Sequence, residues 1–434
     1  GQLARAEAVL EEALSIRRAA DDRPAAVATA AMLSRMLLSV HATPDVLDRT
    51  RALVDEFADQ AAEPAGVAML GQLARALFLM GHNHECLPVA DQVLVAAERL
   101  DLIPVIADTL ITKGSVLADT GRSHEGLSLI ETGVRLAEQH GLPRTGLRGR
   151  LNLGFFQAGD DPEAAMAALQ PALREARRLG DRGLLPNILA NIAGASFFSG
   201  RSREVLPELE AALAMDYEAT HRTWLVTEAA WHRALLGIPV DAELAEIDDA
   251  LRTLTDPQFV AFTHVVRSVA AWARGDEKTA RAENLAAIEG DSGRVVLAYA
   301  LAGRHALLAG DVEAARQDRD NLAALAPHGG DEARLREIQG GIAALEGRPA
   351  EALQLFGQAM PVYERLGLAL DAAIAGLVMV TVMDPSEPRV RAAGLEARER
   401  FAIIGAKPFV ARVDAAMERP APPGVMREAP IPTT

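Results

Sequence analysis

Three side chains around position 84 have the chemistry of metal ligands. The segment "GHNHEC", Gly81 to Cys86, places His82, His84 and Cys86 within five residues. Imidazole nitrogen and thiolate sulfur are the ligands that zinc prefers. A structural explanation competes, because a buried cysteine usually behaves as a small apolar residue and Cys86 stands where other parts of the chain carry alanine or glycine. We favour the structural explanation, and the sequence predicts neither a metal site nor a cofactor.

Two pairs of acids could serve acid–base chemistry. Asp160 and Asp161 precede a helical pattern, where such residues cap a helix N-terminus. Asp318 and Asp320 lie two apart on one predicted helix, so they point in different directions. We interpret the first pair as capping residues and the second as solvated charges.

The stretch "LAGDVEAARQDRDNLAALAP" raises the possibility of a phosphate cradle at Gly310. A phosphate loop needs G-x-x-x-x-G-K-[ST], because the lysine and hydroxyl contact phosphate and Mg²⁺. The chain has no Gly-Lys pair and no G-x-G-x-x-G, H-E-x-x-H, C-x-x-C or G-x-S-x-G motif. The sequence therefore predicts no enzyme in this chain, with Gly310 in a turn and Asp311 as a helix cap.

The composition favours an all-α protein. Half of the 434 residues are apolar and only 4% are aromatic, and no segment shows strand alternation bounded by hairpin turns. A net charge of −16 disfavours binding to nucleic acid or an anionic membrane. One cysteine allows no intramolecular disulfide, and no apolar run is long enough to span a membrane. We expect a cytoplasmic location.

Glycines in turn-like contexts recur at intervals of 35 to 41 residues, if a weaker turn near His41 is included. Small residues often stand seven positions before them, as at Ala74 and Gly114, and five or twelve positions after, as at Cys86 and Gly133. Such a period indicates stacked helical hairpins, whose two helices approach closely at the small residues. The turn glycines are Gly1, Gly81, Gly121, Gly159, Gly200, Gly237, Gly275, Gly310 and Gly347.

These units resemble the tetratricopeptide repeat. The closest are "LNLGFFQAGDDPEAAMAALQPALREARRLGD" (151–181) and "LANIAGASFFSGRSREVLPELEAAL" (189–213). The resemblance covers almost the whole chain, although each motif is degenerate. It implies a right-handed α-solenoid of about ten hairpins over residues 1–417. Residues 418–434 are rich in proline and are predicted to form a disordered tail.

Units this long, and rich in alanine and arginine, are similar to the repeat regions of large bacterial signalling proteins. Examples are LuxR-type and AfsR-type regulators, and class III adenylate cyclases with an ATPase module. The segment "GLEARERFAIIGAKPFVARVDAAM" (394–417) resembles the last repeat of such proteins, with a G-A-x-P turn between its helices. The resemblance implies a regulatory region of a longer protein, which binds a protein, a peptide, upstream domains of the same chain or a small molecule. The alternative is a freestanding scaffold that bridges protein partners.

In the resembled family, the first helix of each hairpin lines a concave surface. When the inner positions of that first helix are mapped onto this sequence, all three tryptophans of the chain fall on them. One interpretation is an aromatic groove for a peptide, a helix or a small ligand. The other, which we favour, is that neighbouring hairpins bury these rings. Rings less than a tenth exposed, with no cavity beside them, would exclude the groove. The predicted face consists of Arg75, Phe78, Phe197, Trp224, Trp231, Phe262, Trp272 and Arg304.

Overall fold

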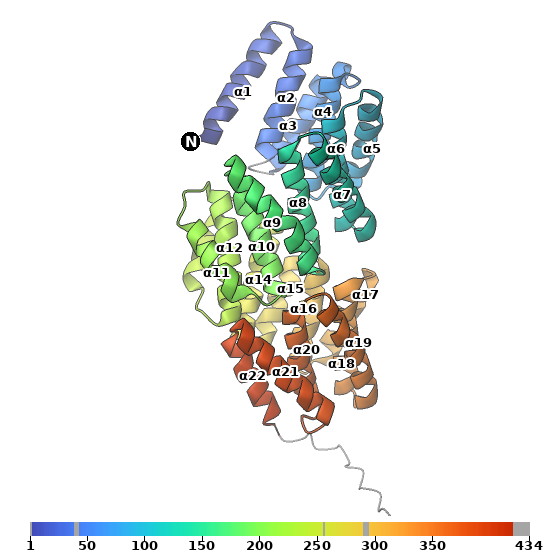
Figure 1. The fold of residues 1–434 in the computed structure, drawn as a ribbon, viewed down its shortest axis with the longest axis vertical. Coiled ribbons are helices and arrows are strands. Elements are labelled where there is room, and N and C mark those ends of the chain that lie inside the picture. Colours follow the sequence, from blue (N-terminus) through green and yellow to red (C-terminus); the bar gives the residue numbers. More distant parts are fainter. Residues whose placement is uncertain (1, 39–42, 255–256, 290–294, 420–434) are drawn as a thin grey trace, which may run out of the picture.

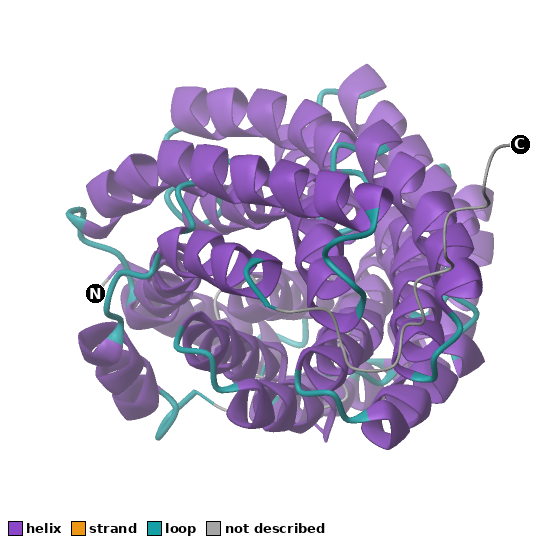
Figure 2. Ribbon diagram, turned by 90° about the horizontal axis from the view of Figure 1, so that it is seen from below, coloured by secondary structure: helices purple, strands orange, loops and turns teal. Residues whose placement is uncertain are grey.

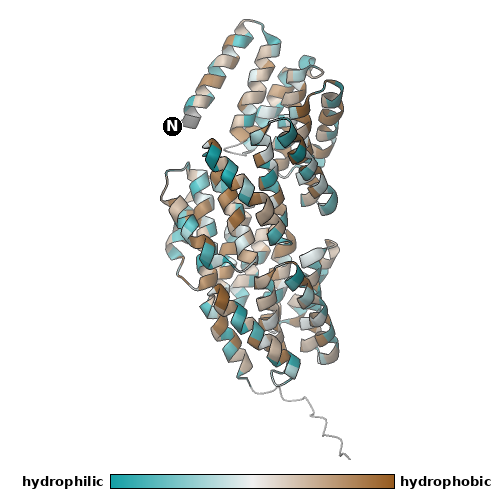
Figure 3. Cartoon of the chain, in the orientation of Figure 1, coloured by the Kyte–Doolittle hydropathy of each residue, from teal (hydrophilic) through white to brown (hydrophobic). Residues whose placement is uncertain are grey.

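The computed structural model describes residues 2–38, 43–254, 257–289 and 295–419. Every regular element in these ranges is helical, which confirms the all-α prediction. Each helix carries apolar residues among polar ones, as Figure 3 shows by colour. The helices are α1 (Gln2–Ala19), α2 (Arg23–Leu38), α3 (Pro44–Glu56), η1 (Ala58–Gln60), α4 (Pro64–Leu79), α5 (Asn83–Arg99), α6 (Ile103–Asp119), α7 (Ser123–Gln139), α8 (Pro143–Gln157), α9 (Pro162–Leu179), α10 (Leu185–Phe198), α11 (Ser202–Leu213), α12 (Ala219–Leu236), α13 (Asp241–Ala250), α14 (Pro257–Ala273), α15 (Glu277–Glu289), α16 (Val295–Leu308), α17 (Val312–Ala324), α18 (Gly329–Leu345), α19 (Pro349–Arg365), α20 (Ala369–Val382), α21 (Pro388–Ile404) and α22 (Lys407–Met417).

The helices from α2 to α21 form a solenoid of successive hairpins. Each even-numbered helix, here called an A helix, packs against the odd-numbered B helix that follows it and, in most cases, against the next A helix. Helix α1 precedes the first A helix and α22 packs against the last hairpin. Figure 1 shows the array running along the long axis of the molecule, and Figure 2 shows the same helices from one end.

Most predicted turn glycines end an A helix in the left-handed region of φ. Seven of them have φ between 73° and 86°, a range in which residues with a Cβ atom are strained. Gly159 also lies in a turn, the one after α8, but without a positive φ. Gly1 and the turn near His41 lie outside the described residues. Gly405, in the G-A-x-P segment, has φ of 88° and separates α21 from α22.

Small residues bring the two helices of a hairpin together at the predicted positions. The Cys86 thiol on α5 donates to the Ala74 carbonyl oxygen on α4 across 3.0 Å. A Cβ atom built on Gly114 of α6 would lie 2.6 Å from the carbonyl oxygen of Gly126 on α7. Since real Cβ atoms do not approach an oxygen so closely, glycine is required there.

The predicted roles of these acids are confirmed except for Asp318, and Asp320 is exposed as expected. Asp161 and Asp311 cap α9 and α17 by accepting from the N–H groups of the third following residues, across 2.9 and 3.0 Å. Asp160 also caps a helix N-terminus, but that of α18, far along the chain, by accepting from the backbone N–H of Gly330. Asp318 is buried and holds Arg281 of the preceding repeat through two bonds of 2.8 and 3.0 Å, so it is not a solvated charge.

The C-terminal hairpins stack on the turn ends of the middle hairpins. Helix α20 contacts α10, and α22 contacts α12 (Figure 1). Arg334 at the start of α18 donates to the Gly159 carbonyl oxygen across 2.8 Å. The ring of Pro408 fills the space beside Gly237. Successive turns of the superhelix therefore contact each other from α8 onward. Residues 420–434, most of the predicted tail, lie outside the described residues.

Candidate ligand-binding face

Four of the predicted inner-face rings lie in the core. Trp231 of α12 is 1% exposed and stacks on Phe197 of α10, with ring centres 3.7 Å apart and planes 14° apart. Phe262 of α14 meets the same indole edge-on at 5.1 Å. These contacts join three consecutive A helices and leave no aromatic surface open at this point.

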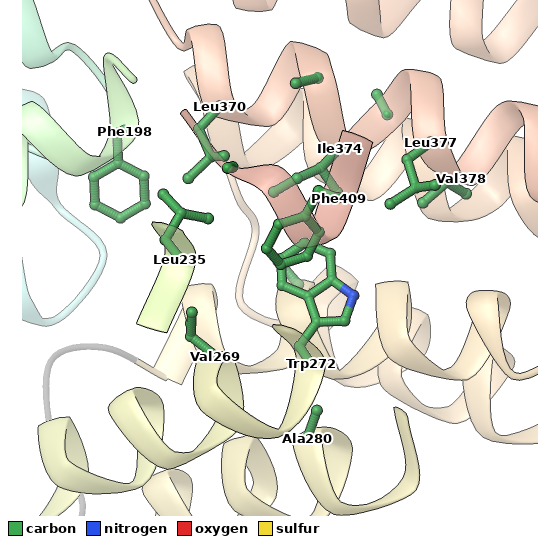
Figure 4. Packing of buried hydrophobic residues seen from close by; sticks show 14 of the residues in the cluster. Phe198, Leu235, Val269, Trp272, Ala280, Leu370, Ile374, Leu377, Val378 and Phe409 are labelled. Carbon is green, nitrogen blue, oxygen red and sulfur yellow. The ribbon is translucent and has the colours of Figure 1, made fainter. Parts of the chain in front are cut away.

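Trp272, the fourth ring, is buried by the C-terminal end of the chain. It is 2% exposed, and Phe409 of α22 meets it at a ring-centre distance of 4.4 Å. Arg412 donates to the Trp272 carbonyl oxygen and pairs with Glu277. Figure 4 shows Trp272 and Phe409 facing each other beside Ile374 of α20. This part of the predicted face is an interface between turns of the superhelix.

Arg304 is also buried, within a network of charges. Its guanidinium bonds both carboxylate oxygens of Glu337, at 3.0 and 2.6 Å, and one oxygen of Asp371 at 2.7 Å. The Tyr363 hydroxyl donates to Glu337 across 2.6 Å. The guanidinium of Arg334 also donates to both carboxylate oxygens of Asp371, at 2.8 and 2.7 Å. Burial raises the pKa of Asp371, but the charges of Arg334 and Arg304 outweigh it and lower the pKa to about 2.

The three remaining residues of the predicted face retain solvent access. Trp224 is half-buried at the edge of the aromatic cluster, with Phe259 edge-on at 5.3 Å. Phe78 and Arg75 are half-buried on α4. Sequence offsets placed all eight residues on A helices, but only Arg75 and Phe78 on α4 and Trp224 on α12 retain access to solvent.

Arg75 is an incompletely compensated cation. Within the ranges that the structure describes, its guanidinium forms no ion pair. Burial and the charges of Arg148 and Arg35 lower its pKa to about 10, while Asp108 acts in the opposite direction. The group remains charged at neutral pH, where an incoming anion would relieve the repulsion.

Arg148 contributes to this region although the sequence pattern did not single it out. Arg148 is buried on α8, and it bonds the carboxylate of Asp108 at 2.9 Å and the Thr112 hydroxyl at 3.3 Å on α6. Arg148 follows Asp108 by 40 residues, which is one repeat length. A comparison of equivalent positions in adjacent repeats could therefore have predicted this ion pair.

The candidate metal ligands His82, His84 and Cys86 do not come together. In the described ranges, no group of three histidine, cysteine or acidic side chains has the geometry to hold a metal ion. Cys86 is fully buried, and this burial raises the pKa of its thiol to about 12. His82 bonds Glu85 at 2.8 Å on the surface. Among the described helices, none is long and apolar enough to cross a membrane.

Hairpins of this form, stacked through their A helices, define an α-solenoid of tetratricopeptide-like repeats. No protein-family model and no curated protein sequence matches the chain. Solved structures of similar shape include a Rap protein complexed with competence and sporulation factor, at 12% identity over 79% of this chain and 99% of that one, with a TM-score of 0.49. Human IFIT1, a dimer with m7Gppp-AAAA, has 15% identity over 87% and 89% and a TM-score of 0.47. The P58(IPK) TPR domain has 14% identity over 90% and 98%, with a TM-score of 0.24. At these identities the likeness concerns the fold alone.

Proposed function

We propose that this chain is a non-catalytic interaction scaffold that binds a segment of a partner protein on the inner face of its N-terminal hairpins. The main support is the half-buried guanidinium of Arg75, which forms no ion pair among the described residues and is close enough to Arg148 for the charge of Arg148 to lower its pKa. Phe78, one turn further along α4, adds apolar surface. A carboxylate next to an apolar side chain on the partner is the ligand that fits this pair.

A comparison of captured proteins tests the proposal. Wild type, Arg75→Gln and the control Arg99→Gln, which alters an exposed arginine on α5, are used as bait in the same lysate. We expect partners that Arg75→Gln loses and Arg99→Gln keeps, and their capture should weaken as salt rises. Identical protein sets from all three baits would contradict the proposal.

We further propose that the scaffold regulates a larger bacterial signalling protein, such as an adenylate cyclase or an ATPase-containing transcriptional regulator, in the cytoplasm. Its support is the resemblance of the long repeats and of the G-A-x-P turn to such regions. Ligand binding would then favour one arrangement of the hairpins over another. The reading frame upstream of residue 1 tests this: a cyclase or nucleotide-binding domain there supports it, and a start codon immediately before residue 1 favours the freestanding scaffold.

A further inference from the structure

Helix α22 closes the inner face at α14 through a ring and a guanidinium. Phe409 covers the indole of Trp272, as Figure 4 shows. Arg412, one turn further along α22, donates to the Trp272 carbonyl oxygen across 3.0 Å and to the carboxylate of Glu277 at the start of α15. The link between the last helix and the middle hairpins therefore depends on one ion pair and one aromatic contact at this point.

The fit of α22 over α14 is incomplete. The indole N–H of Trp272 is buried and has no hydrogen-bond partner among the described residues, so exposure of this group to water would recover a lost hydrogen bond. Beside Arg412, a hollow of about 250 Å³ lies between α22 and the side chains of Leu377 and Thr381 on α20. Gly405, with φ of 88°, joins α21 to α22 and provides a hinge between the two helices.

A buried histidine shares the carboxylate that holds Arg412. Glu277 accepts from Arg412 with Oε1, and its Oε2 bonds Nδ1 of His305 on α16 across 2.8 Å. His305 is 1% exposed, and its Nε2 lies 3.5 Å from the Ser268 hydroxyl of α14. Histidine is the side chain that gains a charge under mildly acidic conditions. A proton on His305 would add a second cation at the carboxylate that anchors α22.

The charges around His305 set the direction of the coupling. Burial lowers the pKa of His305, Glu277 acts in the opposite direction, and Arg412 and Arg304 lower it further. Because Arg412 disfavours the proton on His305, the proton disfavours Arg412 at Glu277 by the same free energy. Release of α22 would remove Arg412 and raise the pKa of His305, so falling pH favours release. Charged groups act on this imidazole from α15, α16, α17 and α22: Glu277, Arg304, Asp318, which also holds Arg281, and Arg412.

We propose that α22 is a proton-sensitive latch on the inner face. At neutral pH, Glu277 holds Arg412 and α22 covers Trp272. Protonation of His305 weakens that hold, and α22 then turns about Gly405 and exposes the Trp272 ring. The hairpins from α2 to α21 keep their own A–B contacts in the open state. The latch lies at α14 and α22, so it is independent of the binding proposed at Arg75.

Fluorescence of Trp272 reports the state of the latch. In a chain with Trp224→Phe and Trp231→Phe, Trp272 is the sole indole. We expect its quenching constant with acrylamide to rise about threefold as the pH falls from about 7.5 to about 5, with an unchanged helical signal by circular dichroism.

Three variants in this background separate the latch from other acid effects. His305→Gln should abolish the rise, because glutamine can donate to Glu277 but takes up no proton in this range. The matched control is His82→Gln, since His82 also bonds a glutamate at 2.8 Å but on the surface; it should keep the rise. Arg412→Met should show strong quenching already at neutral pH.

Each of four results would overturn the proposal. The first is quenching that does not change with pH, and the second is a rise that persists in His305→Gln. The third is loss of the helical signal at the same pH as the rise, because the whole chain would then unfold. The fourth is weak quenching of Arg412→Met at neutral pH, which tests the latch even if His305→Gln does not fold.

Discussion

Replacement of Arg334 by methionine tests the buried charge network that joins α18, α20 and the loop after α8. Arg334 is 1% exposed and bonds Asp371 twice, at 2.8 and 2.7 Å, as well as the Gly159 carbonyl oxygen at 2.8 Å. Removal of one partner from a buried ion pair costs about 3–5 kcal/mol, because the other charge stays buried. Asp371 keeps Arg304 at 2.7 Å, so we expect the lower end, about 3 kcal/mol.

Urea unfolding followed by circular dichroism measures this cost. With a slope of about 3 kcal/mol per molar urea, the midpoint should fall by about 1 M. The matched control is Arg398→Met, which breaks an exposed pair with Asp414 and should leave the midpoint unchanged. Equal shifts in the two variants would show that the buried pair contributes no more than the exposed one.

The same variant should change the acid stability. The pKa of Asp371 is about 2 in the folded chain, below its ordinary value of 3.8, so its ion pairs stabilise the fold above pH 3.8 and this contribution is lost as the pH falls towards 2. The difference corresponds to about 2 kcal/mol. In Arg334→Met the pKa of Asp371 should rise, and unfolding by acid should begin at higher pH. An unchanged acid transition would contradict the role assigned to the pair.

Three further predictions concern the hairpins. His232 is fully buried, and burial lowers the pKa of its imidazole to about 3. Because the unfolded chain then binds a proton that the folded chain does not, the free energy of unfolding should fall by about 1 kcal/mol per pH unit between about pH 6 and pH 4. His232→Gln should flatten this pH dependence in urea titrations. Gly114→Val should lower the free energy of unfolding by about 3 kcal/mol through overpacking against Gly126, and a neutral effect in the same titration would be inconsistent with the close approach. Cys86, whose pKa is raised to about 12, should react with a thiol reagent only on unfolding, and prompt labelling of the native chain would contradict its burial.

The features that could be predicted from the sequence are those that repeat within one unit. The contact between Ala74 and Cys86 lies within one hairpin, and small residues recur at the same spacing in other hairpins of the chain, so the sequence shows the pattern several times. Asp311 is similarly local, because a cap needs only the next three residues. Asp318 was misassigned because its partner, Arg281, lies 37 residues earlier, and only a comparison of adjacent repeats could connect them.

Contacts between superhelical turns could not be predicted in this way. Phe409 meets Trp272, and Gly330 meets Asp160, across more than a hundred residues of chain. Their pairing depends on the accumulated curvature of many hairpins, which no local pattern specifies. The inner-face offsets placed Trp272 on its helix, but whether the ring is open or covered was decided by α22.

The access of solvent to Trp272 distinguishes a closed aromatic core from an open groove, because α22 covers this ring in the structure. In a variant with Trp224→Phe and Trp231→Phe, Trp272 is the sole indole, and acrylamide quenching measures its access to solvent. We predict blue-shifted emission and weak quenching, in line with its 2% exposure, with strong quenching only in urea. Quenching in the native chain as strong as in the unfolded chain would contradict the burial of Trp272 by α22, since the inner face at α14 would then be open.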